Sequence, residues 1–372
     1  MVTASVSKWQ PGQLLFVGFK GTTLPPDLAR RLAAGRIGGV ILFTRNLATV
    51  QQRPDARGRM PPPQLDPVAI RHLIRSIHEA APPDVPVVVA IDQEGGRVQR
   101  LRAPWTRWPP MRHLGEVAED AQTRAVALAL ATELRDLGIA LDFAPVVDVD
   151  TNPDNPIIGD RAFGRTPEVV SRHASIMIEA MQATGVAACA KHFPGHGDTV
   201  TDSHLELPRL PHDIHRLRAV ELPPFAQAIA AGVASIMSAH VVFDALDKKR
   251  PATLSPDVMN LLREELAFDG VVFSDDLEMK AVADNFSPRQ MVEGILDADV
   301  DALLVCSHVG LRDEVLQLLE RQPDGRIERA VERMVRFKST FAPAAREVAL
   351  AEPRQAPPYP EHERLAERLQ HR

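Results

Sequence analysis

The sequence has few cysteines and no long apolar run. The first argues against a disulfide-stabilised protein, and the second argues against a membrane-spanning one. The 372 residues of the chain include only two cysteines, Cys189 and Cys306. Both lie in apolar runs, so we interpret them as buried small side chains rather than as a disulfide, which favours a reduced, cytoplasmic protein. No run approaches the roughly 18 apolar residues of a membrane span, and the N-terminal segment lacks the pattern of a secretory signal. We therefore expect neither a membrane anchor nor export.

An excess of charge of one sign is also missing. Lys and Arg number 43 against 49 Asp and Glu, and the formal net charge is -6 with acids and bases intermixed. Such a balance gives no electrostatic reason to expect nucleic acid or a membrane surface as a partner. Hydrophobic residues make up 45% of the chain, which is enough for a sizeable core. We expect a soluble protein that acts on a small molecule, by default as a monomer.

Short apolar runs rich in Val and Ile recur along the chain, as is typical of strands buried on both faces. Eight such runs are present: 14–18, 39–43, 86–91, 139–147, 186–190, 234–239, 271–273 and 302–306. The segments between them show helical spacing of apolar residues, and several end in a glycine, the residue that terminates a helix at least cost. This alternation predicts an α/β fold, a single (β/α)8 TIM-type barrel, with a doubly wound sheet as the alternative.

Two segments fall outside the alternation. Residues 51–66 are rich in proline and arginine, and we interpret them as a surface insertion after the second strand. The end of the chain is rich in proline and then in charge. Because no linker and no second set of strands is present, we expect residues 10–341 to form one catalytic barrel. Residues 342–372 would form a proline-rich and charged C-terminal extension.

Polar residues gather directly after five consecutive predicted strands rather than before them. In a (β/α)8 barrel the active site is built from the loops at the C-terminal ends of the strands. Helix caps or rim salt bridges would explain one or two such residues, but not five strands that all end in this way. We therefore expect these side chains to converge on one mouth: Asp92, Asp148, Lys191, His192, His240 and Asp275.

The seventh predicted strand ends in two adjacent aspartates, Asp275 and Asp276. An aspartate at this place is held by a rigid element, as a carboxylate nucleophile must be. Adjacent side chains of an extended segment point to opposite sides, so we expect only one of the pair to face a substrate. The other would cap the next helix or brace the loop. Capping is the simpler alternative for either residue.

Three histidines follow the fifth predicted strand. His192 and His196 are four residues apart, as in a helical zinc site, but Pro194 and Gly195 disfavour a helix between them. The sequence also has no glutamate in the place where a zinc hydrolase of this type needs one, so we expect no metal site.

The third histidine of this segment, His204, lies two residues after Asp202. In an extended loop the two side chains could share one side, where the carboxylate would fix the tautomer of the imidazole and raise its basicity. This pairing suits proton transfer near neutral pH, and a plain surface histidine is the alternative.

Four stretches of the sequence resemble glycoside hydrolase family 3, in its bacterial single-domain β-N-acetylglucosaminidase branch. They are IDQEGGRVQR (91–100), NPIIGDRAFG (155–164), AKHFPGHGDTVTDSH (190–204) and FSDDLEM (273–279). The stretches occur in the family's order, and the similarity extends over most of residues 10–340. The resemblance implies a retaining β-N-acetylhexosaminidase without a cofactor, which releases terminal β-linked N-acetylglucosamine. It also implies a cytoplasmic role in recycling peptidoglycan-derived muropeptides.

The resemblance further implies a role for each matched residue. Asp275 would be the nucleophile that forms a covalent glycosyl–enzyme intermediate. His204, paired with Asp202, would be the general acid and then the general base. The remaining matched residues would hold the sugar, because Arg and Lys donate to hydroxyl groups and Asp accepts from them. These residues are Asp92, Arg100, Arg161, Lys191 and His192.

Other functions remain as alternatives. Some relatives with the same His–Asp pair are thought to transfer the sugar to phosphate, which a histidine, unlike a glutamate, would not repel. A non-catalytic sugar-binding barrel is a third hypothesis, but it would not need Asp275, Asp202 and His204. Trp105 and Trp108 could stack on a second sugar or pack away from the site.

Overall fold

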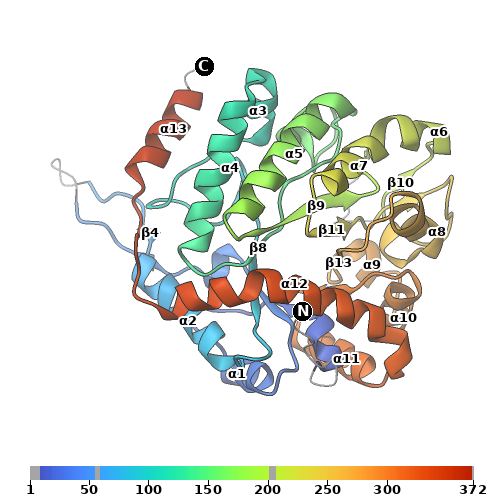
Figure 1. Ribbon diagram of the computed structural model, residues 1–372, viewed down its shortest axis with the longest axis horizontal. Helices are drawn as coiled ribbons and strands as arrows, with labels where there is room; N and C mark the ends of the chain where they lie inside the picture. The colour runs from blue at the N-terminus through green and yellow to red at the C-terminus, as the bar shows by residue number, and fades with distance from the viewer. Residues whose placement is uncertain (1–8, 55–58, 201–206, 371–372) are drawn as a thin grey trace.

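The computed structural model describes residues 9–54, 59–200 and 207–370. Parallel strands close into a barrel that is ringed by helices (Figure 1). In order around the barrel the strands are β1 (Leu15–Val17), β14 (Ala302–Val305), β13 (Val271–Asp276), β11 (Ser235–Ser238), β9 (Ala187–Phe193), β8 (Leu141–Asp142), β5 (Val88–Ile91) and β2 (Gly39–Leu42). Each predicted run overlaps one of these strands, and only β9 and β13 extend beyond their runs, to Phe193 and Asp276. The (β/α)8 barrel is therefore confirmed, and the doubly wound sheet is wrong.

Alternate residues of the barrel strands face two different cores. On β1, Phe16 points into the barrel and meets Phe273 edge-on, with 4.9 Å between ring centroids. Its neighbours Leu15 and Val17 belong to the outer core, where the strands meet the helices. Successive side chains of a strand point to opposite faces, so both sides of each barrel strand must be apolar.

The ring is formed by helices that follow the barrel strands. They are α1 (Pro26–Ala33), α2 (Pro67–Ala80), α4 (Asp120–Arg135), α5 (Pro167–Ala183), α7 (Leu222–Ala230), α8 (Pro256–Asn260), α10 (Pro288–Asp297) and α11 (Val309–Glu320). Most of them carry proline in the first turn, where a missing N–H costs no helical hydrogen bond. Within the described ranges, no helix is long and apolar enough to cross a membrane.

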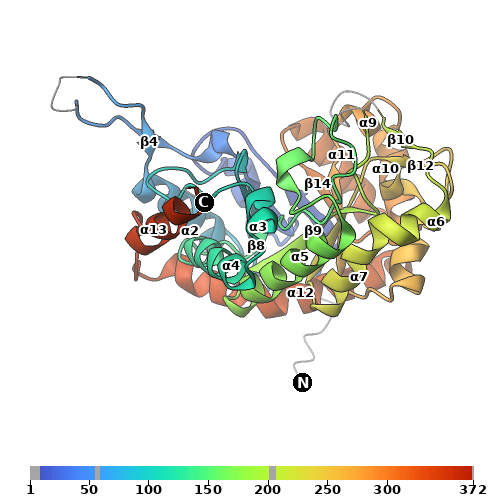
Figure 2. The ribbon, with the colours of Figure 1, turned by 90° about the horizontal axis from the view of Figure 1, so that it is seen from above.

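Shorter elements lie in the connections. The helices among them are α3 (Met111–Val117), α6 (Ile214–Arg216) and α9 (Lys280–Ala283). The short strands pair as β6 (Gln93–Gly95) with β7 (Val98–Gln99), β10 (Arg209–Leu210) with β12 (Val242–Phe243), and β3 (Thr49–Val50) with β4 (Gln64–Leu65). The last pair lies at the base of the predicted insertion at 51–66, whose described parts, 51–54 and 59–63, project from the body at the end of the barrel opposite α12 (Figure 2).

Helix α12 (Asp324–Leu350) closes the N-terminal end of the barrel and crosses in front of the strands in Figure 1. Its side chains Met334, Phe337 and Phe341 join the inward-facing core of the strands. The predicted C-terminal extension begins inside this helix and continues to α13 (Pro360–Gln370), which packs beside α4. There, His362 Nδ1 lies 2.8 Å from Glu133 Oε1. Among the described residues, α12 thus covers the N-terminal end of the barrel, and the opposite end is left open to a ligand.

Candidate active site

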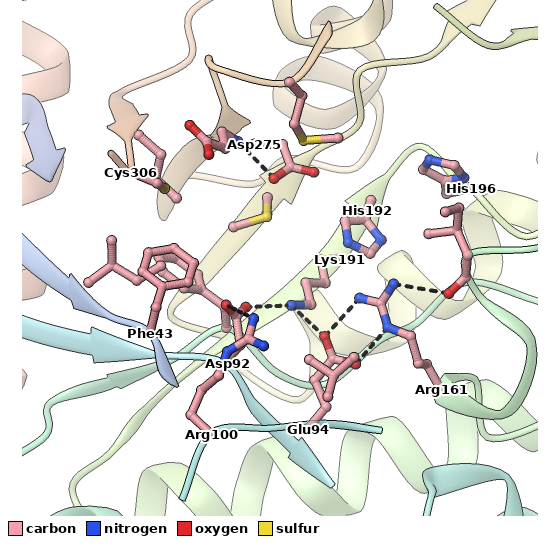
Figure 3. A pocket seen from close by; sticks show the side chains of 18 residues that line it. Phe43, Asp92, Glu94, Arg100, Arg161, Lys191, His192, His196, Asp275 and Cys306 are labelled. Atoms are coloured by element: carbon pink, nitrogen blue, oxygen red, sulfur yellow. Dashed lines mark hydrogen bonds and ion pairs between the residues drawn. The ribbon is translucent and has the colours of Figure 1, made fainter. Parts of the chain in front are cut away.

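A cavity of about 270 Å³ lies at the C-terminal ends of the barrel strands. Ligand pockets span roughly 300–1,000 Å³, so this cavity suits a single small ring. Its lower wall is apolar and includes Ile41, Phe143, Met237 and Leu304. Its polar lining, most of which is labelled in Figure 3, consists of Asp92, Glu94, Arg100, Arg161, Lys191, His192, His196, Asp275 and Asp276.

Five charged side chains along one side of this cavity form a continuous series of ion pairs, here called the ion ladder (Figure 3). Arg161 donates from Nε and Nη2 to the two carboxylate oxygens of Glu94, each at 2.8 Å. Lys191 Nζ lies 2.7 Å from Glu94 Oε1 and 3.1 Å from Asp92 Oδ1. Arg100 Nη2 completes the series 3.0 Å from Asp92 Oδ2.

The ion ladder keeps its buried groups charged. Burial alone would raise the pKa of Glu94, but the Arg161 guanidinium and the Lys191 ammonium hold it well below its usual range. Against the same effect of burial, Lys191 and Arg100 lower the pKa of Asp92. Burial would lower the pKa of Lys191, but Glu94 and Asp92 raise it. The site therefore presents fixed charges, which are ready to bind the polar groups of a ligand.

The local sequence explains how two carboxylates reach the ion ladder. Asp92 and Glu94 are two residues apart in the extended segment after β5, so they point to the same side. Gln93, between them, points the other way, and its Oε1 accepts from the backbone N–H groups of Arg100 and Leu101 at 2.9 Å. Glu94 was missed among the predicted site residues, although its same-side spacing to Asp92 was a signal that could have found it.

Asp275 lies across the cavity from the ion ladder, at the end of β13 (Figure 3). Burial would raise its pKa, but His240 and His192 lower it. The backbone N–H of Asp276 also lowers this pKa, because it donates to Asp275 Oδ1 at 2.8 Å. The Asp275 carboxylate is therefore ionised at neutral pH, which is the state that a nucleophile requires.

The adjacent Asp276 has a different environment. Burial raises its pKa to about 7, and the charges of Glu278 and Asp275 add to the effect. Its Oδ1 accepts from the backbone N–H of Glu278 at 3.1 Å and so braces the loop. Asp276 is thus the aspartate of the pair that braces the loop, as expected for one of the two, although both line the cavity. The register of β13 on β14 shifts between Phe273 and Asp276, and strict alternation does not hold there.

Asp148 holds His192 from behind. Its Oδ2 lies 2.8 Å from His192 Nδ1, and its Oδ1 accepts from the backbone N–H groups of His192 and His196 at 3.2 and 2.7 Å. This contact places the Nδ1 hydrogen toward Asp148 and leaves Nε2 to a ligand. Burial lowers the pKa of His196 to about 4 and also lowers that of His240, so both imidazoles are neutral at pH 7.

The structure brings most of the predicted site residues to this one cavity. The residues expected to hold the sugar all line it, together with Asp275: Asp92, Arg100, Arg161, Lys191 and His192. Asp148 supports His192, and His240 Nε2 lies 3.1 Å from the backbone oxygen of Asp276. The predicted pair Asp202 and His204 lies outside the described residues. The roles of all these residues stay predictions.

Two other hypotheses can be compared with the structure. Trp105 and Trp108 are only 2% and 1% exposed and do not line the cavity, so the stacking alternative is wrong. His192 and His196 do lie near each other, with 5.8 Å between ring centroids. Within the part of the chain that the structure describes, however, no three His, Cys, Asp or Glu side chains form a group that could hold a metal ion.

Comparisons with known proteins agree with this fold and site. The family model for the glycosyl hydrolase family 3 N-terminal domain matches residues 10–337. The beta-hexosaminidase of Thiobacillus denitrificans is 38% identical over 312 residues, which cover 82% of this chain and 81% of that protein. The beta-hexosaminidase of Bordetella parapertussis is 37% identical over 335 residues, or 88% of this chain and 89% of that one.

Solved structures show the same relationship. A family 3 β-N-acetylglucosaminidase from Paenibacillus sp. has a TM-score of 0.86 at 36% identity, covering 99% of this chain and 68% of that chain. NagZ from Neisseria gonorrhoeae has a TM-score of 0.79 at 29% identity, covering 97% of this chain and 98% of that chain. The family match spans nearly the whole barrel, and the chain therefore belongs to glycoside hydrolase family 3 and is a glycoside hydrolase.

Proposed function

We propose that this chain is a retaining exo-β-N-acetylglucosaminidase. The observation that carries the proposal is the half-buried, ionised Asp275 carboxylate, which faces the ion ladder across a cavity the size of one sugar ring. The acetamido sugar is supported by the relatives named beta-hexosaminidase. It is also supported by a NagZ structure from Neisseria gonorrhoeae in complex with N-trifluoroacetyl-D-glucosamine, which is 29% identical to this chain.

The reaction proceeds in two steps on one carbon atom. Asp275 attacks the anomeric carbon and forms a glycosyl ester, while the bond to the aglycone breaks and His204 protonates the leaving oxygen. His204 then removes a proton from water, which attacks the same carbon and releases both the sugar and the Asp275 carboxylate. Two inversions at one carbon retain the β configuration. Asp202 would hold His204 in the required tautomer.

The shape of the cavity supports removal of a terminal sugar. Asp92 supplies acceptors for the sugar hydroxyl groups, and Lys191 and Arg161 supply donors. Below the cavity the barrel is filled by apolar side chains and closed by α12. A sugar bound here can therefore be linked to the rest of a glycan only through the mouth.

We further propose that the natural substrates are muropeptides and that the enzyme acts in the cytoplasm as a monomer without a cofactor. The resemblance to the bacterial single-domain branch supports this role. Recovery of N-acetylglucosamine from purified muropeptides incubated with the enzyme would test the substrate, and an unchanged muropeptide would contradict it.

The direct test compares an aryl β-N-acetylglucosaminide with the matching aryl β-glucoside, each with and without phosphate. We expect turnover of the acetamido sugar alone, unaffected by phosphate, with the β anomer as first product. Turnover of the glucoside would contradict the specificity. A sugar 1-phosphate as product would identify a phosphorylase, and no turnover of either substrate would favour a binding protein.

The proton-transfer pair can be tested separately. Asp202→Ala should lower kcat, but by less than Asp275→Ala, because it removes only the partner that orients His204. Steady-state kinetics of both variants on the aryl substrate measure this order. A loss in Asp202→Ala equal to or greater than that in Asp275→Ala would show that Asp202 does more than orient a histidine.

A further inference from the structure

We infer that Glu94 is a positioning residue, which holds Arg161 and Lys191 in place for the sugar and balances their charge without touching the sugar itself. The inference rests on the proposed function, because it takes this cavity as the sugar-binding site. It adds to the reaction a residue that neither attacks nor exchanges a proton.

Although Glu94 lines the cavity, its carboxylate is largely occupied by the two cations. Its Oε1 receives hydrogen bonds from Lys191 Nζ at 2.7 Å and Arg161 Nη2 at 2.8 Å, and its Oε2 receives Arg161 Nε at 2.8 Å. The side chain is 2% exposed. With three of its roughly four acceptor positions occupied, this carboxylate acts on a ligand mainly through the two cations it binds.

The two cations have few other partners among the described residues. Besides Glu94, Arg161 donates to the backbone oxygen of Ile157 at 3.3 Å, which is a long contact. Lys191 Nζ would keep only Asp92 at 3.1 Å. Glu94 joins Arg161, in the loop after β8, to Lys191 on strand β9. Its loss would free both cations to move.

Charge balance gives Glu94 a second effect. With Glu94 ionised, the ion ladder has three cations and two carboxylates, and Asp275 stands opposite. Without that charge, Asp92 would be the one carboxylate left within the ion ladder for its three cations. A cavity lined in this way attracts small anions, which would compete with the neutral sugar.

The experiment uses the full-length enzyme and replaces Glu94 in two ways. Glu94→Gln keeps the shape and removes the charge, whereas Glu94→Asp keeps the charge on a shorter side chain. A displacement of about 1 Å in a positioning group can cost on the order of 100-fold in rate, so we expect kcat/KM of Glu94→Gln on the aryl β-N-acetylglucosaminide to fall about 100-fold. Most of this loss should be in kcat, because contacts to sugar hydroxyl groups strengthen in the transition state.

Inhibition by inorganic phosphate is the measurement that a purely structural role would not change. We expect phosphate to compete with substrate in Glu94→Gln but not in the wild-type enzyme or in Glu94→Asp. Glu133→Gln is the matched control, since Glu133 is a 1% exposed glutamate with one ion pair, to His362, on the outer side of the barrel. Its kcat/KM should stay within about twofold of wild type, whatever stability it loses.

Three results would overturn the inference. The first is a Glu94→Gln enzyme with wild-type kcat/KM and no inhibition by phosphate, and the second is an equal loss in Glu133→Gln. If the wild-type enzyme does not turn over the aryl substrate, the proposed function fails instead. In that case the inference is tested by calorimetric binding of N-acetylglucosamine to the wild-type enzyme and to Glu94→Gln. Equal affinity of the two proteins is the third result that would overturn it.

Discussion

Two buried lysines lie at opposite ends of the same barrel and differ in their partners. Lys191, at the mouth, has carboxylate oxygens of Glu94 and Asp92 within 3.1 Å. Lys338, on α12 at the closed end, donates to Gln13 Oε1 at 2.5 Å and to the backbone oxygen of Pro86 at 3.0 Å. Within the described residues, no carboxylate forms an ion pair with Lys338. Burial lowers the pKa of Lys338 well below its usual value, whereas the two carboxylates raise that of Lys191.

The contrast shows that buried charges are treated differently at the two ends of the barrel. At the mouth, each charge of the ion ladder is compensated by a neighbour of opposite charge, so the site stays charged before a ligand arrives. At the closed end, the Lys338 stem fills space below the strands and its amine lies 5.5 Å from the Trp9 ring centre. No carboxylate of the described residues compensates the charge of this amine. Substitutions at the mouth should therefore change activity, and those at the closed end should change stability and its pH dependence.

The largest effect is expected from Asp275→Ala at the mouth. Removal of the nucleophile should lower kcat on the aryl substrate by on the order of 10⁴-fold or more. The melting temperature should be unchanged or higher, because a buried charge is removed. Asp284→Ala, an exposed position in the connection after β13, is the control and should keep full activity. Retention of more than a few per cent of wild-type activity in Asp275→Ala would show that another group attacks the sugar.

A smaller effect on activity, but a larger one on stability, is expected from Lys191→Met. The substitution leaves Asp92 and Glu94 buried without the cation between them, and breaking a buried pair costs about 3–5 kcal/mol. Denaturant unfolding measures this loss, and steady-state kinetics should show a fall in kcat/KM in the folded fraction. A Lys191→Met enzyme as stable as wild type would mean that water enters the ion ladder and replaces the lysine.

The smallest effect is expected from Lys338→Met, which should leave kcat/KM unchanged. The folded protein binds fewer protons at Lys338 than the unfolded chain does, between its lowered pKa and its ordinary value of 10.5. The contribution of this site to stability therefore increases as pH rises and levels off above 10.5. Relative to Lys338→Met, the wild-type enzyme should gain stability from neutral to alkaline pH. A difference that is flat with pH would mean that Lys338 stays protonated in the fold.

Much of the architecture could be predicted from local patterns. Buried parallel strands must be apolar on both faces, so the eight runs stand out in the sequence, and the polar residues directly after them mark the mouth. The motif around Asp92 and the motif around Asp275 each lie at the end of such a run. The position of these residues along the predicted strands was therefore enough to predict that they share one cavity.

Local patterns failed where two strands or two loops interact. The register of β13 on β14 shifts between Phe273 and Asp276, which the alternation of side chains along one strand does not reveal. The burial of Trp105 and Trp108 depends on what packs over them. Glu94 is part of a motif used for the prediction, but its partner Arg161 is 67 residues away, so its importance became visible only in the assembled site.

The sequence alone determined the element order, the barrel class and the chemical groups that collect at its mouth, because these follow from side-chain periodicity and from the direction of parallel strands. The tertiary structure decided which groups pair, and hence which of them are charged. The states of Asp275, Asp276, Lys191 and Lys338 depend on burial and on neighbours from distant segments. Electrostatic energy depends on distance through space and not on separation along the chain.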